Sequence, residues 1–258
     1  MNASMQEGRS GAGSFLARKR PEIAAGGYAR DDAGVAFFQR VNALVEPEWT
    51  VIDLGAGRGE QLQGCQNKRK RLLRLQGKAD RVVGLDVDDA IMHHPFLDER
   101  HVITIGESWP LADASADMIV SDWVLEHVGD PAGLVAEAHR VLKPGGWFCA
   151  HTPNKWSYVG LFAQLIPNSL HDTVLKRMWP DRKEQDIFPT VYRMNTLADL
   201  RRHFDGGSWD HFSYHYNSMP KYHGNSSILF NLIGLFTKLA PRKISTDLMV
   251  FIRKKSGN

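Results

Sequence analysis

A turn with three glycines is the part of this sequence best suited to bind a ligand. The apolar run 50–54 leads directly into Gly55, Gly57 and Gly59. Glycine lets the backbone turn tightly and approach a ligand closely, and a helix that starts after the turn favours an anionic group. A tight turn alone does not explain Asp53, or Asp86 at the end of the next apolar run, where a carboxylate can accept hydrogen bonds from ribose hydroxyls. The pattern predicts a site for a nucleoside cofactor.

Two kinds of nucleoside cofactor compete for this turn. The dinucleotide pattern G-x-G-x-x-G requires a glycine at position 60, where this chain has Glu60. A carboxylate next to a pyrophosphate is unfavourable. S-adenosylmethionine is a cationic nucleoside without phosphates and therefore tolerates the acids better. We expect S-adenosylmethionine as the cofactor, with an NAD-dependent oxidoreductase as the alternative.

Histidines are the side chains that could assist methyl transfer. The reaction is a displacement at a carbon already activated by a sulfonium, so a protein mainly has to align donor and acceptor. A hydroxyl acceptor also benefits from a base, most often a histidine. We predict His151, which follows an apolar run, as this base, and His127 as the next candidate. His171 would contribute if its segment covered the site, and alignment without a base is the alternative.

Alternating strands and helices must position these residues. Apolar runs predict strands over 50–54, 81–86, 102–105, 117–121, 147–150, 209–216 and 247–251. Asp31–Asp32, Asp130–Pro131 and Thr196 predict the starts of three helices. This order predicts a doubly wound α/β sheet, in which ligands bind at the carboxyl ends of the parallel strands.

Composition restricts the class of protein. The chain has 258 residues, of which 43% are hydrophobic, enough for a substantial core. A net charge of +3 is too small for a dedicated nucleic-acid binder. Cys65 and Cys149 have no partners at metal-ligand spacing, which argues against a zinc site and favours a reducing compartment. We expect a cytoplasmic protein with no nucleic-acid partner, no metal and no transmembrane segment, and leave peripheral membrane contact and oligomeric state open.

Four motifs, in this order, resemble those of class I S-adenosylmethionine-dependent methyltransferases, most closely the small-molecule branch called type 11. They are V-I-D-L-G-A-G-R-G (51–59), V-V-G-L-D-V-D (82–88), S-D-W-V-L-E-H-V-G-D-P (121–131) and R-V-L-K-P-G-G (140–146). The resemblance covers roughly residues 30–150. It implies a seven-stranded Rossmann-like sheet whose last strand is antiparallel.

The resemblance also implies which residues contact the cofactor. The glycine turn would meet the methionine part, Asp86 the ribose, and the segment near Glu107 the adenine. The full set is Asp53, Gly55, Ala56, Gly57, Gly59, Asp86, Val87, Glu107, Ser108 and Asp122. Glu126–His127 is similar to the E-x-x-E-H metal motif of ubiquinone-biosynthesis O-methyltransferases, but Trp123 replaces its first glutamate. No metal is therefore expected.

The second half of the chain should recognise the methyl acceptor. We expect a flexible arm over residues 1–27 and one methyltransferase domain over residues 28–258. Its cofactor half is 28–150 and its acceptor half 151–258, with insertions at 151–194 and 217–246. Residues 228–240 resemble a short amphipathic helix that could pack on the sheet, cover the site, pair two subunits or touch a lipid-linked substrate.

Aromatic residues together with Asn154 and Arg193 suit a polar, ring-shaped acceptor such as a sugar. This half also resembles a bacterial subgroup associated with surface-polysaccharide synthesis. We expect O-methylation of a small molecule or glycan intermediate, with N-methylation next and nucleic acid last. A non-catalytic cofactor-binding module is a further alternative. The basic run 68–81 is expected to be a solvated helix face.

Overall fold

A β-sheet of mixed direction forms the centre of the protein. The computed structural model describes residues 11–59, 62, 67–165 and 189–257. The strand order is β3-β2-β1-β4-β5-β8-β6, and β7 also pairs with β8. The strands are β1 (Thr50–Leu54), β2 (Arg81–Asp86), β3 (Glu99–Val102), β4 (Ala116–Asp122), β5 (Leu142–Pro153), β6 (Trp209–His211), β7 (Tyr214–Tyr216) and β8 (Asp247–Lys254).

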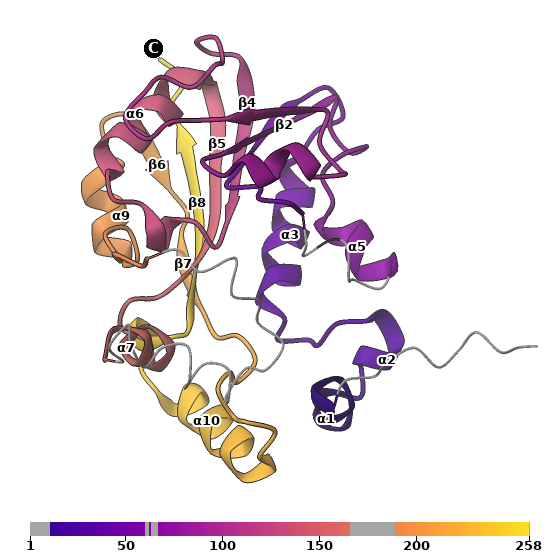
Figure 1. Cartoon of the computed structure of the whole chain (residues 1–258). Coiled ribbons are helices and arrows are strands. Elements are labelled where there is room, and N and C mark those ends of the chain that lie inside the picture. Colours follow the sequence, from indigo (N-terminus) through magenta and orange to yellow (C-terminus); the bar gives the residue numbers. More distant parts are fainter. Residues whose placement is uncertain (1–10, 60–61, 63–66, 166–188, 258) are drawn as a thin grey trace, which may run out of the picture.

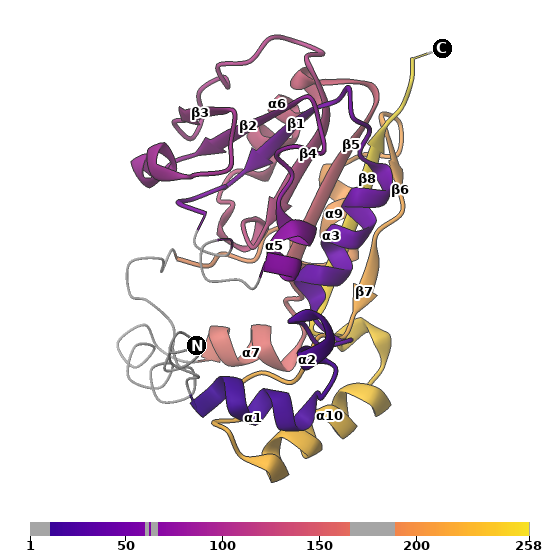
Figure 2. The same ribbon diagram turned by 90° about the vertical axis from the view of Figure 1, so that its right-hand side faces the viewer.

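Helices cover both faces of the sheet. The α-helices are α1 (Gly11–Lys19), α2 (Ile23–Gly26), α3 (Ala33–Leu44), α5 (Asn67–Leu73), α6 (Pro131–Val141), α7 (Tyr158–Leu165), α9 (Leu197–His203) and α10 (Ser227–Leu239). Short 3-10 helices are η1 (Asp89–His93), η2 (Leu125–His127) and η4 (Arg242–Ile244). Helices α6 and α9 lie on one face and α3 and α5 on the other (Figure 1). Helices α1, α7 and α10 gather beyond the carboxyl ends of the parallel strands (Figure 2).

The direction of the strands confirms the predicted fold class. Strands β1 to β5 pair in parallel, whereas β8 runs antiparallel to β5, with Phe148 opposite Ile252. The expected seven-stranded sheet would have one strand on the outer side of β8. In this protein two short strands, β6 and β7, pair with β8 in its place. The division falls at Ser213, whose hydroxyl accepts a hydrogen bond from the backbone N–H of Phe251. A side chain thus replaces a backbone carbonyl at that point of the ladder.

Local capping explains where the helices begin. The Asp32 carboxylate accepts a hydrogen bond from the N–H of Val35 at 3.1 Å, and Asp130 accepts one from Gly133 at 3.1 Å. The Thr196 hydroxyl accepts from the N–H of Asp199. These bonds satisfy N–H groups that have no partner within the first turn of a helix. All three predicted helix starts are confirmed.

Three predictions from the sequence differ from the structure. The strand predicted over 147–150 is longer, because β5 spans Leu142–Pro153 and therefore contains His151. The strand predicted over 102–105 is wrong in position, because β3 spans Glu99–Val102. This strand lies at the sheet edge, where backbone pairing with β2 suffices and apolar side chains are not required. Residues 11–26, part of the predicted flexible arm, are largely helical, because Phe15 stacks on His223 with ring centroids 4.9 Å apart. That partner is too distant in the sequence for a local pattern to reveal.

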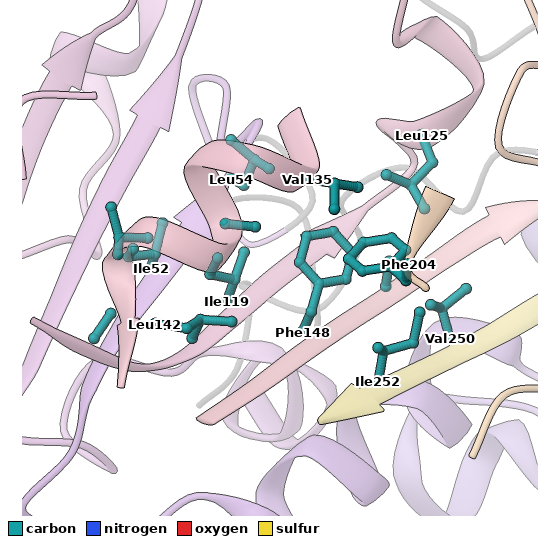
Figure 3. Close-up of a cluster of buried hydrophobic side chains, with 14 of the residues drawn as sticks. Ile52, Leu54, Ile119, Leu125, Val135, Leu142, Phe148, Phe204, Val250 and Ile252 are labelled. Carbon is teal, nitrogen blue, oxygen red and sulfur yellow. The ribbon is translucent and has the colours of Figure 1, made fainter. Parts of the chain in front are cut away.

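Apolar side chains pack on both sides of the sheet. On the side of α6 and α9, Phe148 and Phe204 are fully buried with ring centroids 4.9 Å apart (Figure 3). On the side of α3, Phe37 packs against Phe251 at 5.8 Å. Apolar side chains therefore pack against the sheet on both of its faces.

This packing predicts the effect of a core truncation. Phe148→Ala should lower the free energy of unfolding by about 3–5 kcal/mol, because it removes a buried ring and leaves a cavity. Phe212→Ala is the matched control, since Phe212 is 55% exposed, and its loss should stay below about 1 kcal/mol. Urea denaturation followed by circular dichroism measures both. Equal losses in the two variants would contradict this account of the core.

Candidate functional site

The glycine turn after β1 has a backbone that disfavours other residues. Gly55, Gly57 and Gly59 have φ angles of +74°, +55° and +71°. A Cβ atom at Gly55 would lie 2.3 Å from the side chain of Val124, and one at Gly59 would lie 2.6 Å from the ring of His94. A Cβ atom at Gly57 would meet nothing within 4 Å. The outer two glycines therefore allow close packing, whereas Gly57 leaves room for a ligand against the backbone.

Asp86 ties this turn to the end of β2. Its Oδ2 accepts a hydrogen bond from the N–H of Gly57 at 2.8 Å, and its Oδ1 accepts one from Asp88 at 2.9 Å. A carboxylate oxygen has a second acceptor position, so Asp86 can also accept hydrogen bonds from hydroxyl groups of a ligand. The next residue, Val87, is 46% exposed. The predicted ribose contact thus lies directly beside the glycine turn.

Three carboxylates converge at the carboxyl edge of the sheet. Asp53 lies in register with Gly84 of β2 and Val120 of β4, which places Asp86 and Asp122 two residues further along the neighbouring strands. Burial, together with the negative charges of Asp122 and Asp86, raises the pKa of Asp53 to about 7. A positive charge bound here would relieve this repulsion. The strand order also reverses between β1 and β4, the place where such sheets bind ligands.

His151, the predicted general base, lies between two carboxylates. Its Nδ1 is 2.7 Å from Oδ1 of Asp122, and its Nε2 is 3.4 Å from Oδ1 of Asp247. Burial lowers the pKa of His151, but the two carboxylates outweigh this effect and raise it to about 9. Its side chain is 2% exposed, so the imidazole is a buried cation at neutral pH. The general-base role stays a prediction, and this geometry favours a role in holding Asp122.

Lys221 extends the pairing into a chain of alternating charges. Its Nζ lies 3.6 Å from Oδ1 of Asp247. Burial raises the pKa of Asp247, but Lys221 and His151 hold it well below its usual range. The hydroxyl of Thr246 also donates a hydrogen bond to Asp247 at 2.5 Å. The chain Asp122–His151–Asp247–Lys221 joins two carboxylates with two cations and therefore carries no net charge.

Trp123 covers this chain from the loop after β4. Its indole ring lies edge-on to His151, with ring centroids 5.4 Å apart, and Lys221 Nζ is 4.2 Å from the centroid of the indole. Its backbone φ is +61°, a conformation that is unusual for a bulky residue and has to be held by its surroundings. A hydrogen bond from its N–H to the carbonyl of His151 contributes. The position of the first metal-motif glutamate is thus occupied by a ring that shields a histidine.

His127 differs from His151 in its exposure. It lies on η2, and its side chain is 26% exposed. Its Nδ1 is 2.9 Å from the carbonyl oxygen of Pro189, which can only accept, so Nδ1 carries the hydrogen. A neutral ring then has its lone pair on Nε2, which lies 3.9 Å from Oε1 of Glu126. The neighbouring Glu126 is 3% exposed, and burial raises its pKa to about 7.

The segment 189–195 crosses η2 and carries residues predicted for the acceptor. The N–H of Val191 donates to the carbonyl of Glu126 at 2.7 Å. Arg193 lines a surface hollow of about 400 Å³. Asn154, by contrast, is fully buried and donates hydrogen bonds to the carbonyls of Lys243 and Ser245. Arg193 thus faces a space open to ligands, whereas Asn154 has a structural role.

The remaining predicted contacts lie near the turn or outside the described residues. The loop with Glu107 and Ser108 starts beside Asp86, because the N–H of Ile103 donates to the carbonyl of Asp86, and both side chains are exposed. Ala56 lies within the glycine turn and packs partly against the core. His171 lies outside the described residues. The cofactor contacts stay predictions, while the turn and its three carboxylates do lie together.

Sequence reasoning did not single out Asp247 or Lys221, and it considered Glu126 only as part of a metal motif. Asp247 starts a predicted strand that was expected to be antiparallel, so an acid at its first residue would fall at the carboxyl edge of β5. The acid at the start of the predicted last strand was therefore a signal that the sequence contained. Lys221 lies in an irregular segment, and its proximity to Asp247 follows from tertiary packing alone.

Comparison with known proteins shows which proteins part of this chain is similar to. A family model described as a methyltransferase domain, Methyltransf_11, matches residues 52–150. The chain is 45% identical over 85 residues to a probable S-adenosylmethionine-dependent methyltransferase of Mycolicibacterium smegmatis, covering 31% of this chain and 32% of that one.

Other relatives differ in the atom they methylate. A dimethylglycine N-methyltransferase of Parasynechococcus marenigrum is 32% identical over 144 residues, 51% of this chain and 50% of its own. A malonyl-[acyl-carrier protein] O-methyltransferase of Hahella chejuensis is 34% identical over 98 residues, 37% of this chain and 33% of its own. The matches thus span about a third to a half of the length of these relatives.

A solved structure shares the fold over nearly the whole chain. It belongs to the complex between the Haloferax volcanii Trm112 methyltransferase activator and a methyltransferase, with a TM-score of 0.52 and 17% identity over 95% of this chain and 96% of the other. The sheet order, the glycine turn and the family match agree. Residues 52–150 match a methyltransferase-domain family, part of the chain is similar to S-adenosylmethionine-dependent methyltransferases, and the chain shares the fold of a solved methyltransferase structure.

Proposed function

We propose that the protein transfers a methyl group from S-adenosylmethionine to an oxygen atom of a small molecule or glycan intermediate. The observation that carries the cofactor part is the convergence of Asp53, Asp86 and Asp122 around a glycine turn with open space at Gly57. S-adenosylmethionine supplies a methyl group activated by a positively charged sulfonium. Burial and the charges of Asp122 and Asp86 raise the pKa of Asp53, and the sulfonium and ammonium charges of the cofactor would offset the repulsion among these carboxylates.

The same electrostatics argue against a dinucleotide cofactor. A pyrophosphate would add negative charge beside three carboxylates, which raises the free energy of the complex. Asp86 would instead bind the ribose, since hydrogen bonds from the N–H groups of Gly57 and Asp88 fix its carboxylate beside the glycine turn. The exposed side chains of Val87 and Ile105 would be covered by the adenine ring. The acids thus favour a cationic nucleoside over NAD.

An oxygen acceptor fits the partly exposed His127. A hydroxyl group has to lose its proton during transfer, and a neutral imidazole with its lone pair on Nε2 can accept that proton. The hydrogen bond between Nδ1 and Pro189 supports this tautomer. His151 is paired with Asp122 and Asp247, so we propose that it positions Asp122 and does not contact the acceptor. N-methylation is the second candidate, because relatives of both kinds exist.

The hollow beside η2 is a place where a polar acceptor would bind. Its lining combines cationic, carboxylate and aromatic groups, which can bind the hydroxyl groups of a sugar. These residues are Pro131, Lys155, Val191, Tyr192, Arg193, Asp199, Arg202 and His203. The hollow and His127 are connected through the segment 189–193, which bonds to η2.

Cofactor binding should depend on the ionisation of Asp53. Because its pKa is about 7, the carboxyl is partly protonated below neutral pH, and a bound cation favours the ionised form. S-adenosylmethionine affinity should therefore rise between pH 5.5 and 7, with release of protons on binding. Asp53→Asn should weaken binding by about 1–3 kcal/mol and remove most of this pH dependence. Isothermal titration calorimetry in two buffers with different ionisation enthalpies measures both effects.

Asp210→Asn is the matched control, because the Asp210 side chain is 49% exposed on β6, and it should bind like the wild type. Absence of S-adenosylmethionine binding, together with tight NAD binding, would contradict the proposed cofactor. Binding without methylation of any compound in an extract of small molecules and cell-envelope glycans, followed by mass spectrometry, would indicate a non-catalytic module.

The two histidines should separate in a kinetic test. His127→Ala should lower turnover roughly 10²–10⁴-fold, the typical contribution of a positioned base, with unchanged cofactor affinity. We expect the wild-type rate to decrease at acidic pH, where the base is protonated, and His127→Ala should lose this decrease. His151→Gln should keep that decrease but weaken cofactor binding, since Asp122 loses its charged partner. Full turnover of His127→Ala, with loss of the decrease at acidic pH in His151→Gln, would reinstate His151 as the base.

A further inference from the structure

Helix α10 presents an apolar stripe to the outside of the protein. Its members are separated by four, three and four residues, which places them on one side of a helix. They are Ile228, Leu232, Leu235 and Leu239, with exposed fractions of 76%, 58%, 55% and 76%. Leu229 and Phe236 flank the stripe and are 39% and 49% exposed. Such a continuous set of exposed leucine-like side chains marks a contact surface.

The opposite side of α10 is fixed to the protein. Phe230 is 3% exposed and packs edge-on against Phe15 of α1, with ring centroids 5.7 Å apart. The side-chain amide of Asn217 donates a hydrogen bond to the carbonyl of Thr237 at 2.9 Å. The Ser226 hydroxyl caps the first turn by accepting from the N–H of Leu229. The helix is therefore anchored through one face and already formed while its outer face is exposed.

The charges around the stripe are positive. Residues 217–246 contain no Asp or Glu, whereas Lys238 lies on the helix and Arg242 and Lys243 follow it, all exposed. Of the acids that contact this segment, Asp31 is paired with Arg20 at 2.5 Å, and the buried Asp247 lies 3.6 Å from Lys221. Basic side chains next to an apolar stripe are suited to a negatively charged surface that also has an apolar interior. A second copy of the chain fits less well, because pairing through this face would bring the same cations together.

We propose that α10 binds to the surface of a membrane that contains anionic lipids, with its apolar stripe inserted among the acyl chains. A helix of 13 residues is about 20 Å long, which suits a position parallel to the membrane plane. Within the part of the chain that the structure describes, no helix is long and apolar enough to cross a membrane. Helix α10 lies beyond the carboxyl ends of the parallel strands, so the proposed membrane contact is on the side where ligands enter (Figures 1 and 2).

Flotation with lipid vesicles tests this proposal on the full chain. The protein should float with vesicles of phosphatidylcholine containing one third phosphatidylglycerol, and far less with pure phosphatidylcholine. Leu232→Gln combined with Leu235→Gln should weaken partitioning about tenfold or more, because two inserted apolar side chains are lost. Lys238→Glu should weaken it about fivefold on anionic vesicles, since it reverses one charge at the surface.

Matched variants keep the test specific. Phe212→Gln changes an apolar residue with the same exposure as Leu235, and Arg201→Glu reverses an exposed cation on α9; both should float like the wild type. Midpoints of thermal unfolding should show that all variants are folded.

Three results would overturn the proposal. The first is no flotation with anionic vesicles at low salt. The second is wild-type flotation of the double leucine variant. The third is a dimer in sedimentation experiments that the same leucine substitutions dissociate, which would assign the stripe to a second copy. None of these results depends on methyltransferase activity, so the proposal can fail or succeed separately from the proposed function.

Discussion

The charge balance at the carboxyl edge of the sheet is the constraint on which the rest of the site depends. Asp122 belongs to two groups of charges at once. On one side it repels Asp53, whose pKa is raised, and on the other it is paired with the buried cation of His151. The Asp122–His151–Asp247–Lys221 chain alternates carboxylates and cations, so the cation of His151 offsets part of the negative charge that Asp122 adds beside two further carboxylates. The carboxyl edge thus combines a cluster of three carboxylates with a balanced chain of charges.

The backbone of the glycine turn leaves open space beside the carboxylates, which a ligand site also requires. The glycine turn allows Val124 and His94 to pack closely at its two ends while the middle glycine faces open space. Asp86 then holds the turn through the N–H of Gly57, so the carboxylate that is proposed to bind the ribose also shapes the loop. The negative charge beside the glycine turn and the conformation of that turn therefore depend on the same residue, so a substitution of Asp86 would change both.

The sequence was sufficient for those parts of the molecule that local patterns determine. The bounds of β1 and β2, the three capped helix starts and the antiparallel last strand follow from apolar runs, capping residues and motif order. The edge strand β3 escaped this reasoning because an edge strand can be polar, as Glu99 and Arg100 are. The surroundings of His151 escaped it because Asp247 and Lys221 reach the histidine through tertiary contacts between distant segments. The sequence predicted that His151 lies near the carboxyl edge of the sheet, although the residue belongs to β5 and does not follow it, and it did not predict the charge state of the imidazole.

The place of β8 in the sheet also bears on how the chain folds. β8 lies between β5 and β6, so Phe148 cannot complete its pairing until residue 252 has been synthesised. Until then β5 is an edge strand whose backbone groups are unpaired and whose two faces carry apolar side chains. Such edges can pair with strands of other chains. Because contacts between distant segments also form slowly, this interval is prolonged. Any version of the chain cut before residue 247 would keep that edge open permanently and would be prone to aggregate.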